Sequence, residues 1–188
     1  MKKLTTSLLA LVALSASSFA NAADYDLDIK GAHAFINFKA SHLGYSWLTG
    51  RFNKFDGNFS YDKDKLEDTK IEVTIDPASI DSNHAERDKH LRGKDFLHVS
   101  KFPESKFVST KVTDKGDGKI EVQGNFTLHG VTKPIVIDAV KIGEGKDPWG
   151  GYRAGFSGTT TIDVADYNFK AAWAGKIQLE LLIEGIRK

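Results

Sequence analysis

The sequence of 188 residues contains no cysteine at all. Without thiols the chain cannot form a disulfide, a thiolate nucleophile or a zinc–thiolate site. A chain of this length can nevertheless bury enough apolar surface to be stable without covalent crosslinks, even in an oxidising compartment. The absence therefore excludes thiol chemistry and leaves the hydrophobic core to stabilise the fold.

An excess of charge of either sign is also missing. The chain carries 26 Lys and Arg residues against 25 Asp and Glu residues. Nucleic-acid binding depends on a surplus of positive charge, and no basic helix suggests a membrane surface. We therefore expect no nucleic-acid partner and no stable membrane insertion.

Long apolar runs are confined to the N-terminus. Lys2 and Lys3 precede the apolar segment 8–14, and Ala20–Asn21–Ala22 supplies small residues at the positions that a signal peptidase reads. This run is roughly half of the ~20 residues that a spanning helix needs, and no cysteine follows it for lipid attachment. We predict a signal peptide over 1–22, cleaved after Ala22, and one soluble periplasmic domain over 23–188.

Recognisable catalytic motifs are lacking too. No Gly-x-Ser-x-Gly elbow occurs, and the six histidines show no metal-site spacing along the chain. We therefore predict no catalytic residue, no metal ligand and no cofactor, although a metal site assembled from distant segments stays open. An enzyme acting on a lipid or a small metabolite, assisted by a metal on histidines, is the weaker alternative.

What the chain does contain is short segments of alternating apolar and polar residues. Segments 71–75, 120–128 and 177–183 all show period-two alternation, which is typical of antiparallel strands with one wet face. Further strands are expected over Tyr25–Lys30, Ala32–Ala40, Gly50–Tyr61, Glu104–Thr113, Val131–Ile142 and Tyr152–Ile162. Eight or nine strands with glycine-containing turns between them predict an all-β sandwich or closed barrel.

One segment favours a short surface helix. Asn83 can cap it, Glu86 lies three residues further on as in a capping box, and Gly93 can end it. The segment Asn83–Gly93 has few apolar residues, so the helix must lie on the barrel surface or across its mouth.

The polar residues around this helix have three readings. Arg87, His90 and Arg92 would contact the polar or anionic head group of a ligand whose tail enters the barrel. The same residues equally fit a solvated helix face with local ion pairs, and we favour that reading. In an intermediate reading, one arginine forms an ion pair with a carboxylate and so holds the helix onto the barrel.

The chain is rich in aromatic residues, with 12 Phe and 3 Trp. An eight-stranded barrel has an interior just wide enough to be filled by such side chains or to hold one ligand. The sequence pattern leaves both possibilities open.

Several separated motifs carry a family resemblance. The segments Arg87–Ser109 (RDKHLRGKDFLHVSKFPESKFVS) and Gly124–Ile135 (GNFTLHGVTKPI) are similar to the signature segment and to the strand–turn–strand motif, respectively, of the YceI-like family. Phe126-Thr127 stands where Leu-Thr is usual in the family. The resemblance continues through His42–Gly44, Gly155–Gly158, Asp166-Tyr167 and the last strand, and so covers nearly all of 23–188.

The resemblance implies an extended eight-stranded antiparallel barrel of lipocalin-like architecture and, often, a homodimer. It also implies a long hydrophobic cavity for a polyisoprenoid chain and no established catalytic activity. The hypothesis is a periplasmic protein that sequesters or transports a long-chain isoprenoid of quinone or polyprenyl type. The alternative is a structural or stress-protective barrel without a ligand. The residues expected to line the cavity, each equally plausible as core, are Ile36, Phe38, Val73, Phe96, Phe126, Phe156 and Trp173.

Overall fold

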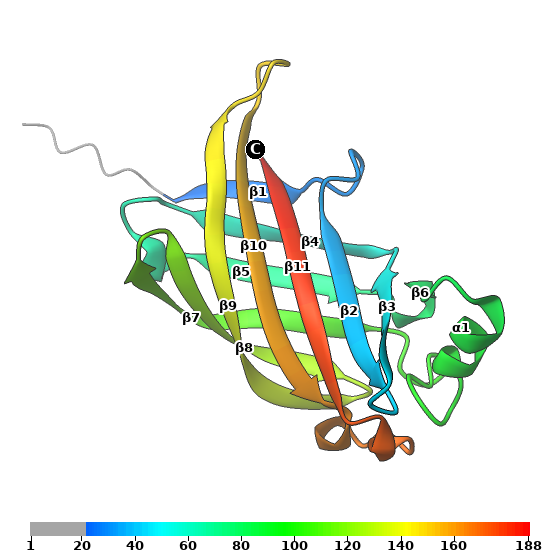
Figure 1. Cartoon of the computed structure of the whole chain (residues 1–188). Coiled ribbons are helices and arrows are strands. Elements are labelled where there is room, and N and C mark those ends of the chain that lie inside the picture. Colours follow the sequence, from blue (N-terminus) through cyan, green and yellow to red (C-terminus); the bar gives the residue numbers. More distant parts are fainter. Residues whose placement is uncertain (1–21) are drawn as a thin grey trace, which may run out of the picture.

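The computed structural model describes residues 22–188, so the predicted signal peptide lies outside the described residues except for Ala22. Strands dominate the described chain (Figure 1). They are β1 (Ala23–Leu27), β2 (Phe35–His42), β3 (Ser46–Phe52), β4 (Phe55–Tyr61), β5 (Lys70–Ile75), β6 (Ile80–Asp81), β7 (Ser105–Gly116), β8 (Lys119–Leu128), β9 (Val131–Lys146), β10 (Tyr152–Asp163) and β11 (Lys176–Arg187).

The strands form a closed antiparallel barrel of eight, which confirms the predicted fold class. The ring runs β1-β4-β5-β7-β8-β9-β10-β11, and β11 pairs back with β1. The strand β11 also pairs with β2 over Ile177–Leu182, next to its pairing with β1 over Gly185–Arg187. The strands β2, β3 and β6 therefore extend the barrel wall beyond the closed ring.

Three long strands of the barrel wall, here called staves, are each interrupted and so form two strands: β1 with β2, β3 with β4, and β5 with β6. Residues 28–34 separate β1 from β2, and the 3-10 turn η2 (Pro77–Ser79) separates β5 from β6. The predicted single strand Gly50–Tyr61 was wrong, because β3 and β4 are interrupted at Asn53 and Lys54. Ser79 binds both of these residues, since its carbonyl accepts from Asn53 N at 3.1 Å and its Oγ from Lys54 N at 2.9 Å.

The alternating pattern places one face of each strand inside. In β8 the buried positions are Ile120, Val122, Gly124, Phe126 and Leu128, while the residues between them are partly or fully exposed. Burying apolar side chains is the main driving force for such a fold, so the alternation decides which face of the strand turns inward.

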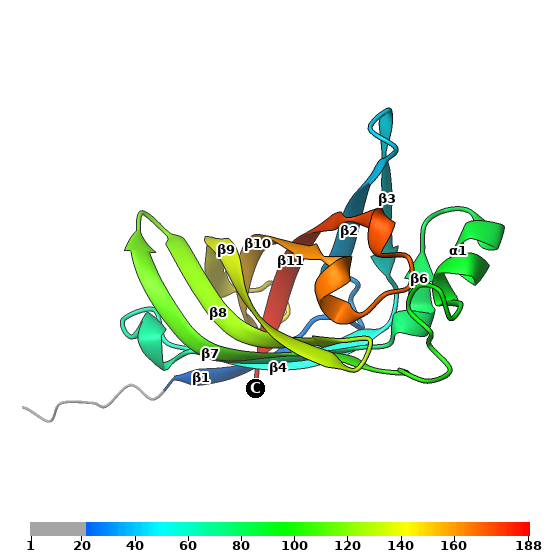
Figure 2. The same cartoon turned by 90° about the horizontal axis from the view of Figure 1, so that it is seen from below.

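Over residues 22–188 there is a single α-helix, α1 (Ala85–Arg92), which lies beside β6 outside the ring (Figure 2). Gly93 ends it as predicted, and a Cβ there would lie 2.9 Å from the carbonyl oxygen of His90. The predicted cap and capping box were wrong. The N-cap is His84, whose Nδ1 accepts from Arg87 N at 3.2 Å. Asn83 instead has φ 61°, in the left-handed region that reverses the chain before the helix.

The two ends of the barrel differ in construction. One end, here called the mouth, carries the β2–β3 hairpin, α1 and the 3-10 turns η3 (Val164–Tyr167) and η4 (Ala172–Ala174). The other, here called the closed end, carries the β9–β10 connection and the end of β11, at the top of Figure 1. Within residues 22–188, no helix is both long and apolar enough to cross a bilayer.

Candidate ligand-binding site

The barrel interior is not completely filled by side chains. A chamber of about 740 Å³, here called the outer chamber, opens among β2, β3, α1 and η4 at the mouth. Its walls are apolar for the most part. Its volume falls within the ~300–1,000 Å³ range of typical small-molecule sites.

A second chamber of about 140 Å³, the inner chamber, lies within the closed ring. Tyr61, Thr69 and Thr160 are the only lining residues that carry polar side-chain atoms; the others are aliphatic side chains, phenylalanines and one glycine. None of the residues that line this chamber has a charged side chain. Its surface therefore suits only an apolar group.

Four side chains line both chambers: Ile36, Ile75, Phe126 and Leu179. All four are at most 8% exposed. They form a waist between the outer and inner chambers. The two chambers therefore lie in line along one interior, from the mouth toward the closed end.

The structure places six of the seven residues predicted to line a cavity along this interior and the seventh, Trp173, at its rim. Ile36 and Phe126 lie at the waist, Val73 and Phe156 line the inner chamber, and the other three, Phe38, Phe96 and Trp173, line the outer chamber. Trp173 is 76% exposed and so belongs to the rim rather than to the interior. Contact of these residues with a ligand stays a prediction.

The ionisable residues around the outer chamber are all basic or histidine. They are His42, Arg87, His90 and Lys176, and no Asp or Glu is among the lining residues. The His90 ring packs edge-on against Phe96 with 4.9 Å between ring centroids, and Phe96 packs in the same way against Trp173 at 6.0 Å. The mouth therefore combines an aromatic wall with positive charge.

The three residues predicted to contact a head group differ in their positions. Arg87 and His90 line the outer chamber, whereas Arg92 does not. Arg92 instead donates from Nε to the Ala78 carbonyl and from Nη2 to the Ile80 carbonyl, each at 2.7 Å. Arg92 thus pins α1 to the barrel, as in the intermediate reading, but through backbone carbonyls rather than a carboxylate.

Ser82 holds the other side of α1. The buried carboxylate of Asp88 accepts from Ser82 N at 2.8 Å and from Ser82 Oγ at 2.5 Å. Arg87 donates from Nε to Ser82 Oγ at 2.8 Å and from Nη2 to the Ser82 carbonyl at 2.6 Å. These contacts fix the Arg87 side chain beside the outer chamber.

Two buried hydroxyl groups face this interior without a hydrogen-bond partner among the described residues. Ser105 Oγ lies at the outer chamber, and Thr69 Oγ1 lies at the inner chamber. A buried hydroxyl without a partner loses its hydrogen bonds to water and gains none. Each is a place where a polar atom of a ligand would be stabilised.

Aromatic rings pack against one another along the inner chamber, which Phe59, Tyr61 and Phe156 line. Tyr25 stacks on Phe59 with 4.9 Å between ring centroids and an interplanar angle of 4°. Phe156 packs edge-on against both Phe59, at 5.7 Å, and Tyr61, at 5.3 Å. This aromatic cluster gives the interior a wall at the closed end.

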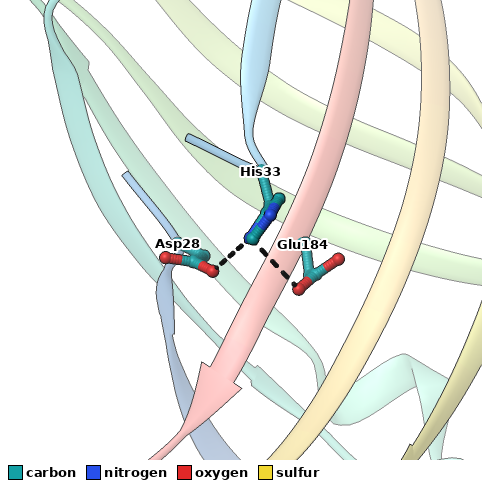
Figure 3. Close-up of side chains that lie close together, drawn as sticks. All are labelled: Asp28, His33 and Glu184. Carbon is teal, nitrogen blue, oxygen red and sulfur yellow. Dashed lines mark hydrogen bonds and ion pairs between the residues drawn. The ribbon is translucent and has the colours of Figure 1, made fainter. Parts of the chain in front are cut away.

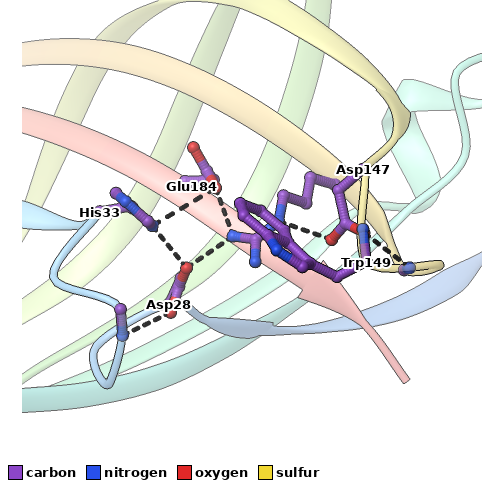
Figure 4. A network of polar contacts seen from close by, with 8 residues as sticks. Asp28, His33, Asp147, Trp149 and Glu184 are labelled. Carbon is purple, nitrogen blue, oxygen red and sulfur yellow. Dashed lines mark hydrogen bonds and ion pairs between the residues drawn. The ribbon is translucent and has the colours of Figure 1, made fainter.

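A polar network lies at the closed end, where the first stave is broken. His33 Nδ1 lies 2.8 Å from Asp28 Oδ2 and 3.8 Å from Glu184 Oε1 (Figure 3). Arg153 Nη1 donates to Asp28 Oδ2 at 2.6 Å and to Glu184 Oε1 at 2.5 Å. Arg153 Nε donates to Asp147 Oδ2 at 2.8 Å, which adds the β9–β10 connection to the same network (Figure 4).

The network decides the ionisation of Asp28. Burial by itself would raise the pKa of Asp28, but hydrogen bonds from His33, Arg153 and Gly31 N outweigh burial and lower it to about 2. Hydrogen bonds to the carboxylates of Asp28, Asp147 and Glu184, in that order of size, raise the pKa of Arg153. Asp28 is therefore ionised and paired at neutral pH.

Asp28, His33 and Glu184 bring three possible metal-ligand atoms within 4.8 Å of one another. The guanidinium of Arg153 already bridges the two carboxylates that would be the anionic ligands. A fixed positive charge at that position competes with a metal cation. We interpret the cluster as an ion-pair clip that joins β10 and β11 to the broken first stave.

Sequence reasoning missed this clip and both unpartnered hydroxyl groups. Asp28 and His33 are five positions apart in a turn, which is the only local signal that pointed to a contact. Arg153 is separated from Asp28 by 125 positions, so no spacing along the chain reveals that pair. The lack of a hydrogen-bond partner for the hydroxyl groups of Ser105 and Thr69 depends on their neighbours from other strands.

Comparison with known proteins adds relatives over the whole domain. A model of the YceI-like domain matches residues 25–184. A UPF0312 protein of Vibrio vulnificus strain YJ016 is 58% identical over 170 residues, which cover 90% of each chain.

Two solved structures share the architecture. The YceI protein of Campylobacter jejuni is 30% identical, with a TM-score of 0.72, over 79% of this chain and 90% of its own. A polyisoprenoid binding domain from Saccharophagus degradans is 15% identical, with a TM-score of 0.65, over 87% and 98% of the two chains. At that identity the likeness concerns the fold. From the domain match and the Vibrio relative together, the chain belongs to the YceI-like family.

Proposed function

We propose that this protein binds a long-chain isoprenoid lipid, of the quinone or polyprenyl type, and sequesters or carries it in the periplasm. The observation that carries the proposal is the pair of chambers in line, the inner of which has almost no polar lining. A long, flexible apolar chain is the ligand whose shape and chemistry match such an interior.

Apolar burial supplies the driving force for this binding. Each CH₂ group moved from water into an apolar environment contributes ~0.8 kcal/mol. A chain that passes the waist at Ile36 and Phe126 contacts apolar side chains in both chambers. Longer chains should therefore bind more tightly, up to the length at which the aromatic cluster of Tyr25 and Phe59 blocks further entry.

The mouth favours a polar or anionic head group. Arg87 and His90 lie beside the outer chamber, and no carboxylate lines it. In this arrangement the tail occupies the interior and the head group remains near α1. The function needs no catalytic step, since binding and release are sufficient for a carrier.

Two further observations support the proposal. The Saccharophagus degradans domain of the same architecture is described as binding a polyisoprenoid. The predicted signal peptide over 1–22 would deliver the chain to the periplasm, where an apolar lipid needs a protein to cross water. A homodimer remains a further prediction.

The test is native mass spectrometry of the protein purified from its own cells without detergent, followed by organic extraction and analysis of the extract. We expect one isoprenoid lipid per chain. Protein stripped of lipid should regain that mass on incubation with a long-chain quinone. A mass equal to the bare chain, unchanged after incubation with quinones and polyprenyl lipids, would contradict the proposal and favour a structural barrel.

A further inference from the structure

The β2–β3 hairpin exposes large apolar side chains at its tip. Leu43 is 70% exposed, Tyr45 86% and Trp47 60%. Across the mouth, Trp173 in η4 is 76% exposed. Leu43, Trp47 and Trp173 also line the rim of the outer chamber. These four residues, here called the rim patch, surround the entrance through which a ligand must pass.

The hairpin turn keeps its leucine in an unfavourable conformation. Tyr45 N donates to the His42 carbonyl at 2.9 Å, and the two residues between them, Leu43 and Gly44, have φ of 54° and 79°. Positive φ at both central positions is the pattern of a type I′ turn, whose first central residue is normally Asn, Asp or Gly. Leucine there costs free energy that asparagine would avoid. Departures from local rules of this kind concentrate at functional sites.

Positive charge accompanies the rim patch. Lys39 Nζ lies 4.4 Å from the centre of the Trp47 ring. Lys176 and His42 line the same chamber, and no acidic residue does. The nearby carboxylate of Asp95 faces a lysine of its own, since Lys170 Nζ lies 3.9 Å from it.

We propose that the rim patch docks the mouth of the barrel onto an anionic lipid bilayer. Tryptophan and tyrosine are enriched at the bilayer interface, and a leucine at a protruding tip inserts between the lipids. The lysines complement anionic head groups. The net charge of the whole chain is near zero. The positive charge near the mouth, and not the net charge of the chain, therefore favours binding to an anionic bilayer.

Docking deepens the proposed carrier function, because it would bring the entrance of the chamber against the membrane that holds an isoprenoid lipid. Peripheral contact of this kind needs no membrane-spanning segment. Its test nevertheless does not require isoprenoid binding, since the vesicles contain none.

The experiment is flotation of the purified protein with vesicles of phosphatidylcholine, with or without phosphatidylglycerol. We expect binding to the anionic vesicles that weakens in high salt. Leu43→Asn combined with Trp47→Ser should reduce the partition coefficient about tenfold or more, because two interfacial apolar side chains are lost. Trp149→Ser is the matched control. Trp149 is 79% exposed at the closed end, and its loss should leave vesicle binding unchanged.

Leu43→Asn alone separates docking from folding. Asparagine suits the turn, so the variant should melt at the same or a higher temperature while it binds vesicles more weakly. Tyr45→Ser, at a tip residue that does not line the chamber, should weaken vesicle binding but leave uptake of a quinone from detergent micelles unchanged. Uptake without vesicle binding would overturn the docking proposal alone, and vesicle binding without uptake would overturn the carrier proposal alone.

A second copy of the chain is the competing occupant of the rim patch. Sedimentation velocity of the wild type and of the Leu43→Asn, Trp47→Ser variant decides this point. A dimer that dissociates in the variant, together with no vesicle binding by the wild type, would show that the rim patch is a self-interface and would overturn the proposal.

Discussion

Arg153 and Asp28 lie 125 positions apart in the chain, and yet Arg153 Nη1 is 2.6 Å from Asp28 Oδ2. Asp28 follows β1 directly, and Arg153 lies at the start of β10. The contact therefore joins the turn between β1 and β2 to the start of β10. Because Asp28 is 4% exposed and Arg153 21%, little water screens the pair.

This pair predicts acid sensitivity. Asp28 has a pKa of about 2 in the folded protein against an ordinary value of 3.8, so the unfolded chain binds its proton first as the pH falls. The contribution of Asp28, about 2 kcal/mol, is complete above pH 3.8 and is lost as the pH falls toward 2. Urea denaturation at a series of pH values measures this loss.

Asp28→Asn should remove the contribution at neutral pH, and its deficit relative to the wild type should shrink as the pH falls toward 2. Asp26→Asn is the control, because Asp26 is 61% exposed and only pairs with Lys188 at the surface. Its effect should be within about 1 kcal/mol. An Asp28→Asn deficit that stays constant with pH would contradict the ionised pair.

The two hydrogen bonds of Arg92 predict a local loss of order. Arg92→Ala should accelerate hydrogen exchange in α1 and lower the free energy of unfolding by about 1.5–3 kcal/mol, because two backbone carbonyls lose a charged donor. Lys89→Ala is the control on the same helix, since Lys89 is 80% exposed and lies 3.9 Å from Glu86. Equal exchange in both variants would show that Arg92 does not hold the helix.

The waist and the inner chamber predict a dependence on ligand length. Val73→Phe adds volume inside the inner chamber and should reduce affinity for long-chain isoprenoids about tenfold while sparing short ones. Val108→Phe is the same change on the neighbouring strand, at an outward position that is 38% exposed. Isothermal titration with a series of quinones measures both. An equal loss for all chain lengths would place the tail elsewhere.

Ser105 predicts an asymmetry between two serines of the same region. Ser105→Ala removes a buried hydroxyl without a partner and should leave the free energy of unfolding unchanged or raise it by about 1 kcal/mol. Ser82→Ala removes the hydroxyl that contacts Asp88 and Arg87 and should lower it by about 1–3 kcal/mol. Thermal and urea unfolding of both variants provide the comparison. A clear loss in Ser105→Ala would mean that its hydroxyl is satisfied.

The strands were predictable because alternation is a local property. Ile120, Val122 and Phe126 share one parity, and burial of that face explains the direction of every side chain in β8. The breaks were not predictable, because the interruption at Asn53 depends on a carbonyl from Ser79, which belongs to another stave. The cap of α1 was misassigned for a similar reason, since Asn83 is needed for the reversal after β6.

The sequence by itself determined the all-β class and the inward parity of residues such as Val122 and Phe126. This was possible because a side chain on a strand points to one of two faces of the sheet, and the apolar–polar alternation of its immediate neighbours shows which face is buried. Only the tertiary structure decided that the interior contains two chambers, that Arg92 binds backbone carbonyls and that Arg153 meets Asp28. Cavity volume and long-range ion pairs depend on how distant strands close around one another, and that information is not present in any single segment of the chain.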